Sequence, residues 1–188
     1  MDALGAWVRE HLSDVIIALA AAIALAGGAV WWWRPLMAWW WRRAVKGLPD
    51  YVRSRAERYV GASRIHDIDD RVKIRSDLCR DMGAFVNRAG ISRRTLAHSG
   101  HEGLVVALAG AIAAAPRKGD DRLIVLTDNS HLSGNAQHKI LEAFDALVSK
   151  PGLLSPVDYN LIKAWVDGIA DKEPKLPARI IALKGKLE

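Results

Sequence analysis

The sequence predicts a mainly α-helical protein, with one N-terminal transmembrane helix, a mostly helical soluble domain after it, and room for one minor β element. Three observations support this fold class. Residues 15–33 carry no charge, basic residues concentrate directly after them, and residues 50–188 place apolar side chains at helical spacing. The chain therefore divides into a short lead (1–14), an anchor with its exit segment (15–46) and a helical domain (50–188).

The lead and the membrane span come first. Residues 1–14 are amphipathic, and we expect them to lie on the outer membrane surface or to extend the spanning helix. The uncharged run VIIALAAAIALAGGAVWWW rises about 1.5 Å per helical residue, which covers roughly the 30 Å core of a bilayer. Small residues on two of its ridges would let such helices associate. These residues are Ala18, Ala22 and Ala26, then Ala20, Ala24 and Gly28.

Tryptophan and arginine mark the exit from the span. Tryptophan favours the headgroup boundary, where its ring is buried and its N–H stays hydrated. The predicted interface residues are Trp31, Trp32, Trp33, Arg34, Trp39, Trp40, Trp41, Arg42 and Arg43. After Pro35 the segment either ends a long tilted helix or lies flat in the interface. Gly47 to Pro49 end it.

The charges predict the orientation. Residues 1–14 hold one basic and three acidic residues, a net charge of −2, whereas residues 34–64 hold eight basic and two acidic residues, a net charge of +6. Lysine and arginine stay on the cytoplasmic side, so the N-terminus is predicted outside and the helical domain in the cytoplasm. In a bacterium this is the inner membrane, and anionic headgroups are the expected lipid partner.

The first helix predicted in the domain runs from about Asp67 to Asn87. Apolar residues recur every three or four positions, and Arg75 is a polar exception among them. They are Ile65, Ile68, Val72, Cys79, Met82 and Val86. Gly90 ends this helix.

Two uncharged segments follow. Leu104 to Ala115 is too short to cross a bilayer and is predicted to be a buried core helix. Leu123 to Leu126 is rich in β-branched residues and bounded by charges, which makes it the best strand candidate. We expect Thr127 to Asn129 to form an ordinary turn, although α/β proteins often place functional carboxylates at such a strand end.

Two more helices complete the prediction. Asn135 is expected to cap a helix that ends near Val148. Ser155 and Pro156 are expected to cap and open the last one. Its predicted apolar face holds Leu161, Ile162, Trp165, Val166 and Ile169. The segment Ile180–Leu183 is ambiguous between strand and helix.

No residue pattern predicts catalysis or a cofactor, so we expect a protein that is not an enzyme. His98 and His101 lie three apart with a glycine between them, unlike the zinc helix that places two histidines four apart. We expect them, with His131 and His138, to be surface or capping residues. Cys79, the single cysteine, is expected to behave as a small buried hydrophobe.

One local stretch, FVNRAGISRRTL at residues 85–96, resembles the turn of TetR-type helix-turn-helix proteins. A helix ends in Ala89-Gly90, Ile91 makes a short apolar step, and Ser92 caps a second helix. The resemblance implies DNA contacts by Ser92, Arg93, Arg94 and Thr95. Ser99 and Gly100 interrupt what would be the recognition helix, so we expect Arg93 and Arg94 to be surface residues and nucleic acid not to be the partner.

The function expected from these observations is a single-pass membrane-anchored interaction or scaffolding protein, with a homo-oligomer as one form of the assembly. A membrane-tethered DNA-binding protein is the first alternative. The second is a lysis or pore-forming protein similar to phage holins, given the alanine-rich span and the basic tail. The protein partners themselves are not identified by the sequence.

Overall fold

The computed structural model of the chain describes residue 39 and residues 43–125, 127, 132–170, 183 and 185–186. The chain separates into two compact units, Met1–Arg43 and Ala44–Glu188. The predicted lead, the span over residues 15–33 and its small-residue ridges lie outside the described residues. So do the predicted interface residues other than Trp39 and Arg43.

In the first unit, the Arg43 guanidinium carbon lies 5.7 Å from the centroid of the Trp39 ring. Trp39 is 54% exposed. Across the described part of the chain, no helix is both long enough and apolar enough to span a bilayer.

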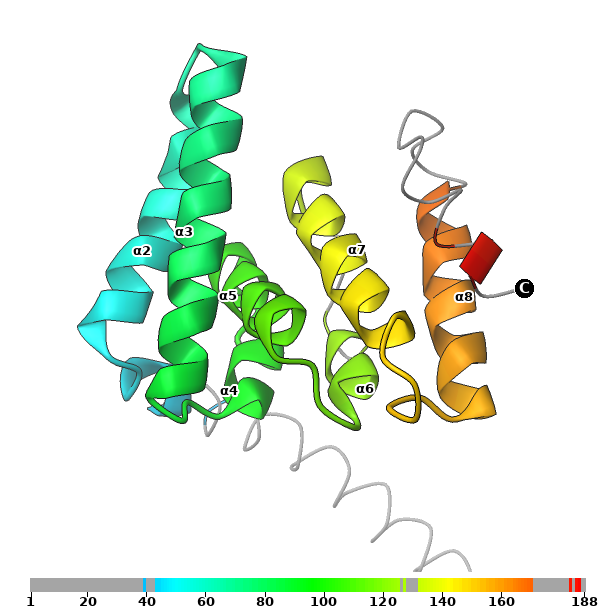
Figure 1. Ribbon diagram of the computed structural model, residues 1–188. Helices are drawn as coiled ribbons and strands as arrows, with labels where there is room; N and C mark the ends of the chain where they lie inside the picture. The colour runs from blue at the N-terminus through cyan, green and yellow to red at the C-terminus, as the bar shows by residue number, and fades with distance from the viewer. Residues whose placement is uncertain are drawn as a thin grey trace, which may run out of the picture. The chain divides into compact units, whose positions relative to one another are not determined.

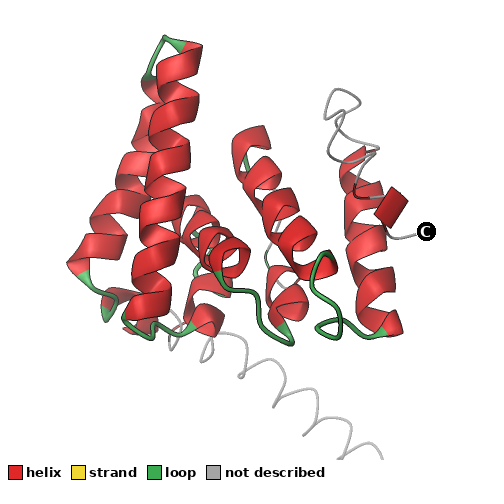
Figure 2. Ribbon diagram, in the orientation of Figure 1, coloured by secondary structure: helices red, strands yellow, loops and turns green. Residues whose placement is uncertain are grey.

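The second unit is a bundle of helices, which confirms the mainly α prediction (Figures 1 and 2). Its described residues contain no strand. The elements in chain order are α2 (Asp50–Gly61), the 3₁₀ turn η1 (Ala62–Arg64), α3 (Ile68–Arg88), α4 (Arg93–Ala97), α5 (Glu102–Ala114), α6 (Asp120–Val125), α7 (Gly134–Val148) and α8 (Pro156–Ala170).

Helix α5 is the centre of this bundle. Every residue from Gly103 to Ile112 is buried, and α2, α3, α4 and α7 all pack against it. A helix that is apolar on all sides is stable only when it is surrounded by others. The predicted buried core helix is therefore confirmed.

The contact between α3 and α5 is a backbone contact. A Cβ added at Gly83 would lie 2.3 Å from the Gly110 carbonyl carbon, and one added at Gly110 would lie 2.4 Å from the Cys79 carbonyl oxygen. Glycine inside a helix costs about 1 kcal/mol relative to alanine, so close packing is the physical reason for these glycines.

Helix α3 has nearly the predicted bounds, with Asp67 capping it by accepting a hydrogen bond from the Asp70 N–H at 2.9 Å. The predicted apolar face is wrong in its first half, however. Ile68 and Val72 are 63% and 46% exposed, because the start of α3 extends beyond the core (Figure 1).

Arg75, the polar exception on that face, is buried. Its Nε donates to the Tyr59 carbonyl oxygen at 3.2 Å, and its guanidinium lies 4.8 Å from the centroid of the Tyr59 ring. These contacts with α2 replace the water that an arginine would otherwise need.

The strand predicted at Leu123–Leu126 is wrong, because residues 120–125 form helix α6. The Asp120 carboxylate accepts a hydrogen bond from the Arg117 N–H at 2.7 Å, which fixes the turn before the helix. Ile124 is buried, whereas Leu123 and Val125 pack only in part. The contact between Asp120 and Arg117 and the burial of Ile124 on one side favour a helix over the strand that the side chains of Leu123, Ile124 and Val125 would otherwise prefer.

The last two helices begin close to their predicted positions. Ser133, not Asn135, caps α7 by accepting from the Ala136 N–H. Asn135 instead accepts a hydrogen bond from the Tyr59 hydroxyl at 2.6 Å. Ser155 caps α8 as predicted, since its hydroxyl accepts from the Asp158 N–H at 3.3 Å.

The predicted apolar face of α8 is correct in part. Ile162 and Val166 are fully buried, whereas Leu161 is 37% exposed. The Trp165 ring meets the Phe144 ring of α7 edge-on, with 5.1 Å between the centroids.

Candidate functional site

The helix-turn-helix fragment folds as a turn between α3 and α4. Gly90 adopts a φ of 64°, and Ser92 caps α4. Helix α4 is only five residues long and ends before Ser99. The expectation that Arg93 is a surface residue is wrong, because Arg93 is only 7% exposed. Thr95, another member of the predicted DNA-contacting set, is 9% exposed. Ser92 and Arg94 are the exposed members of the predicted set.

Arg93 instead holds four helices together. Its guanidinium pairs with the Asp120 carboxylate of α6 and donates to the Asn87 Oδ1 of α3 at 2.6 Å. It also donates to the carbonyl oxygens of Ala111 and Ala115, at 3.1 and 2.8 Å, at the C-terminal end of α5. Burial raises the pKa of Asp120, although the Arg117 N–H and Arg93 oppose this shift. The arrangement is structural: the two terminal nitrogens of the guanidinium make all of these contacts, and within the described part of the chain the Arg93 Nε is buried without a hydrogen-bond partner.

A second buried carboxyl lies beside this network. Asp121 is fully buried, and within the described part of the chain neither of its side-chain oxygens has a hydrogen-bond partner. Burial and the nearby Asp158 carboxylate raise the pKa of Asp121. The Ser155 N–H and hydroxyl, which donate to Asp158 at 2.9 and 2.7 Å, lower the pKa of Asp158 to about 2.

We expect Asp121→Asn to stabilise the domain at neutral pH by about 1 kcal/mol, because it removes a buried charge without changing the side chain's shape. An Asp pKa that is raised on folding makes the native state bind more protons, so the free energy of unfolding falls as the pH rises above about 4. Urea unfolding of both forms should give equal stability in acid and a growing difference toward neutral pH. A constant difference at every pH would contradict this origin.

The described histidines and Cys79 do not belong to a cluster of possible metal ligands. Among the described residues, no three His, Cys, Asp or Glu side chains gather closely enough to hold an ion. The Cys79 thiol lies 3.5 Å from the Val106 carbonyl oxygen, and burial raises the pKa of Cys79 to about 11. A thiol with such a pKa is almost wholly protonated at neutral pH and is a poor nucleophile.

A small pocket opens between α2 and the start of α5. Its volume is about 90 Å³, and its lining residues are Val45, Arg53, Ala56, Glu57, His101 and Leu104. In the described part of the chain, the Arg53 Nε and the His101 Nδ1 are buried without a hydrogen-bond partner. The pocket has room for a few waters.

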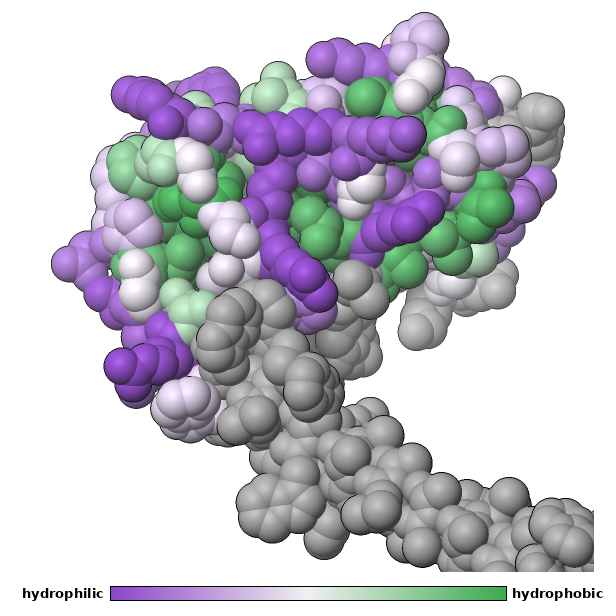
Figure 3. Space-filling view, turned by 90° about the horizontal axis from the view of Figure 1, so that it is seen from below, coloured by the Kyte–Doolittle hydropathy of each residue, from purple (hydrophilic) through white to green (hydrophobic). Residues whose placement is uncertain are grey.

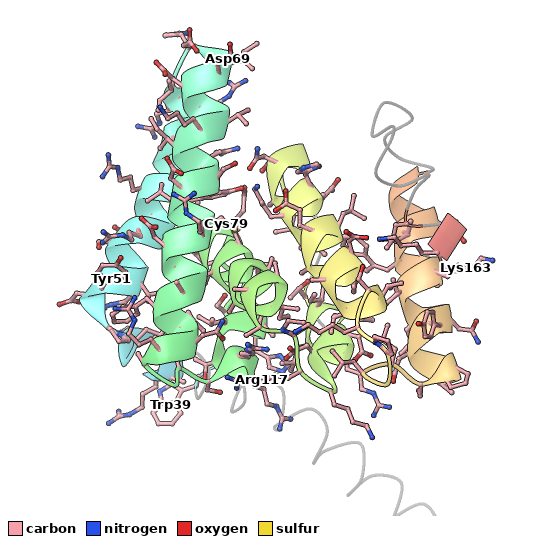
Figure 4. The ribbon with its side chains drawn as sticks, in the orientation of Figure 1. Trp39, Tyr51, Asp69, Cys79, Arg117 and Lys163 are labelled. Atoms are coloured by element: carbon pink, nitrogen blue, oxygen red, sulfur yellow. The ribbon has the colours of Figure 1, made fainter. Side chains whose placement is uncertain are left out.

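One end of the domain is basic. The end of α3, helix α4, the α5–α6 turn and the α7–α8 turn all lie at the lower end in Figure 1, where Figure 4 places Arg117. We call this surface the base. Figure 3 looks onto it and shows hydrophilic side chains crossing the surface between apolar patches. Its exposed basic residues are Arg88, Arg94, Arg117, Lys118 and Lys150.

The opposite end is the turn between α2 and α3, where Figure 4 places Asp69. We call it the tip. Three apolar side chains are exposed there: Val60 at 38%, Ile68 at 63% and Val72 at 46%. Exposed acidic and basic residues surround them, among them Arg64, Asp69 and Asp70.

Comparison with known proteins identifies no relative of this chain. No protein-family model, curated protein or solved structure matches it.

Sequence reasoning missed the base, although a signal was present. The chain has no acidic residue between Asp81 and Glu102, between Glu102 and Asp120, or between Asp145 and Asp158. Each of these acid-free stretches contributes one part of the base. Only the fold brings the three stretches to the same end.

Proposed function

We propose that this chain is a single-pass membrane-anchored interaction protein, whose helical domain binds a protein partner and so assembles a membrane complex. The predicted span over residues 15–33 supplies the anchor. The observation that carries the proposal is the exposed apolar tip, which lies at the far end of the domain from the residues where α2 begins (Figure 1).

The tip has the composition of a protein-binding surface. Ile68 and Val72 are one helical turn apart on α3, and Val60 at the end of α2 is also exposed. A centre of apolar side chains with a charged rim is the usual anatomy of an interface core and its surroundings. The tip is also the part of the domain that extends beyond the core formed around α5 (Figure 1).

The tip is tested by Ile68→Asp combined with Val72→Asp, in the full-length chain purified from its host in mild detergent. We expect the proteins that co-purify with the natural chain to be lost, because two carboxylates would have to be buried in the interface. Leu161→Asp is the control, since Leu161 is also an exposed apolar residue, at 37%, but lies on α8. Partners that persist in the tip variant, or that depend on nucleic acid and disappear on nuclease treatment, would contradict the proposal.

The orientation is tested separately. A reporter active only in the cytoplasm, fused after Glu188, is expected to work, because the net charge of −2 before the span and +6 after it retains the C-terminal side in the cytoplasm. Activity of an exported reporter alone at the same position would show that the domain faces outward.

A further inference from the structure

We propose that the base of the helical domain is a second membrane contact, which lies on anionic lipid headgroups. This inference rests on the proposed membrane anchoring and adds the surface by which the anchored domain meets the bilayer. It concerns residues 88–157, far along the chain from the Trp- and Arg-rich exit segment.

The charge of the base is one-sided. Its exposed arginines and lysines come from three stretches that contain no acidic residue. Three of the carboxylates that border these stretches are withdrawn into the protein, since Asp120, Asp121 and Asp158 are 3%, 0% and 5% exposed. The exposed charges within these three stretches are therefore all positive, which gives the base a positive field.

Apolar side chains accompany these charges. Val157, in the first turn of α8, is 63% exposed, and the preceding residues Leu153 and Leu154 are only partly buried. Figure 3 shows apolar patches interleaved with hydrophilic side chains on this face. Basic residues beside exposed apolar ones fit a headgroup layer, which offers both phosphates and acyl chains.

A nucleic acid fits the base less well. Helix α4 is five residues long, and Arg93, one of the two arginines that the helix-turn-helix resemblance would place against DNA, is buried in the Asp120 pair. The exposed arginines could bind the phosphates of a nucleic acid, but the exposed Val157 side chain makes neither a hydrogen bond nor an ion pair with a phosphate backbone.

The position of the base in the fold favours the same membrane that holds the anchor. The second unit begins at Ala44, and Figure 1 shows this beginning at the same end of the bundle as α4 and α6. A domain tethered at this end presents the base at high effective concentration to the adjacent headgroups.

The test uses the full-length chain reconstituted into vesicles of phosphatidylcholine with phosphatidylglycerol, or of phosphatidylcholine alone. A fluorophore is attached at Ala89→Cys on the base or at Ser63→Cys on the tip, both of which replace exposed uncharged residues. Cys79 is buried and stays unlabelled, which the unsubstituted chain verifies. Nitroxide groups on the lipid headgroups then quench a fluorophore that lies near the membrane.

We expect quenching at Ala89→Cys to be several-fold stronger than at Ser63→Cys in anionic vesicles, and to fall at about 1 M salt, where the Debye length is about 3 Å. Charge reversal of the base should abolish the difference. That variant carries Arg88→Glu, Arg94→Glu, Arg117→Glu and Lys118→Glu. A control with the same charge change carries Arg58→Glu, Arg64→Glu, Lys73→Glu and Lys163→Glu, all at exposed positions away from the base, and should keep the difference.

Quenching that is equal in neutral and anionic vesicles, or unchanged by reversal of the base, overturns the inference while the anchoring stands. If an alkaline wash removes the chain from the vesicles, the proposed anchoring is contradicted instead. The inference about the base is then tested by co-sedimentation of the chain with anionic vesicles, which must fall as the salt concentration rises if the base binds headgroups. Sub-micromolar binding of a labelled DNA duplex that is lost on reversal of the base assigns the surface to nucleic acid and overturns the inference.

Discussion

Arg93→Ala is expected to cost the helical domain about 3–5 kcal/mol of unfolding free energy, the usual loss when one member of a buried ion pair is removed. The variant leaves the Asp120 carboxylate buried without its cation, and it removes donors from the carbonyl oxygens of Ala111 and Ala115. Domains of this size are stable by roughly 5–15 kcal/mol, so the variant approaches the limit of folding. Urea unfolding followed by circular dichroism of the detergent-solubilised chain measures the loss.

Arg94→Ala is the matched control. Arg94 is the next residue on α4, carries the same charge and is exposed, so its removal should change stability by no more than about 0.5 kcal/mol. The combination of Arg93→Met with Asp120→Leu should recover much of the loss, because no buried charge is then left unpaired. Equal effects of Arg93→Ala and Arg94→Ala would show that Arg93 is not the buried centre of four helices.

Gly110→Ala is expected to destabilise the domain by about 3 kcal/mol, at the upper end of the usual cost of overpacking. The new methyl group would lie 2.4 Å from the Cys79 carbonyl oxygen. Backbone atoms inside a helix cannot rotate away as a side chain does, so α3 and α5 must separate along their contact. The same unfolding measurement detects this loss.

Gly168→Ala makes the same chemical change, but we expect it to raise the stability of the domain instead of lowering it. Gly168 lies within α8, and an added Cβ meets nothing within 4 Å. In an exposed helix this substitution should stabilise by about 0.5–1 kcal/mol, because alanine has the higher helix propensity. A stabilising Gly110→Ala would mean that the two helices are further apart than the structure shows.

Local signals predicted the helices well where one residue type decides the outcome. Asp67 and Gly90 bound α3, and Ser155 begins α8 as its pattern indicates. The uncharged run from Leu104 to Ala115 was sufficient to predict the burial of α5. These features depend on neighbours in the sequence, so they can be read without the fold.

Burial of charge could not be predicted in the same way. Arg75 and Arg93 are buried because Tyr59 and Asp120, 16 and 27 residues away, supply their partners. The apolar run in α6 resembles a strand in sequence. The contact that favours a helix, from the Arg117 N–H to the Asp120 carboxylate, lies in the turn before the run, so the run itself does not indicate it. The base is formed by three stretches that come together only in the folded bundle, so no local sequence pattern predicts it.

The central position of α5 also sets an order of events during synthesis. The ribosome releases α2 and α3 first, and their facing surfaces stay uncovered until α5 has emerged, since both helices pack against it. Helix α5 in turn buries its remaining side only once α7 is made, more than thirty residues after α5 begins. In that interval an apolar segment without charge is exposed to solvent, a state prone to aggregation. A released chain that ends after Ala115 therefore leaves one side of α5 uncovered, whereas a chain that extends through Val148 has the central helix enclosed.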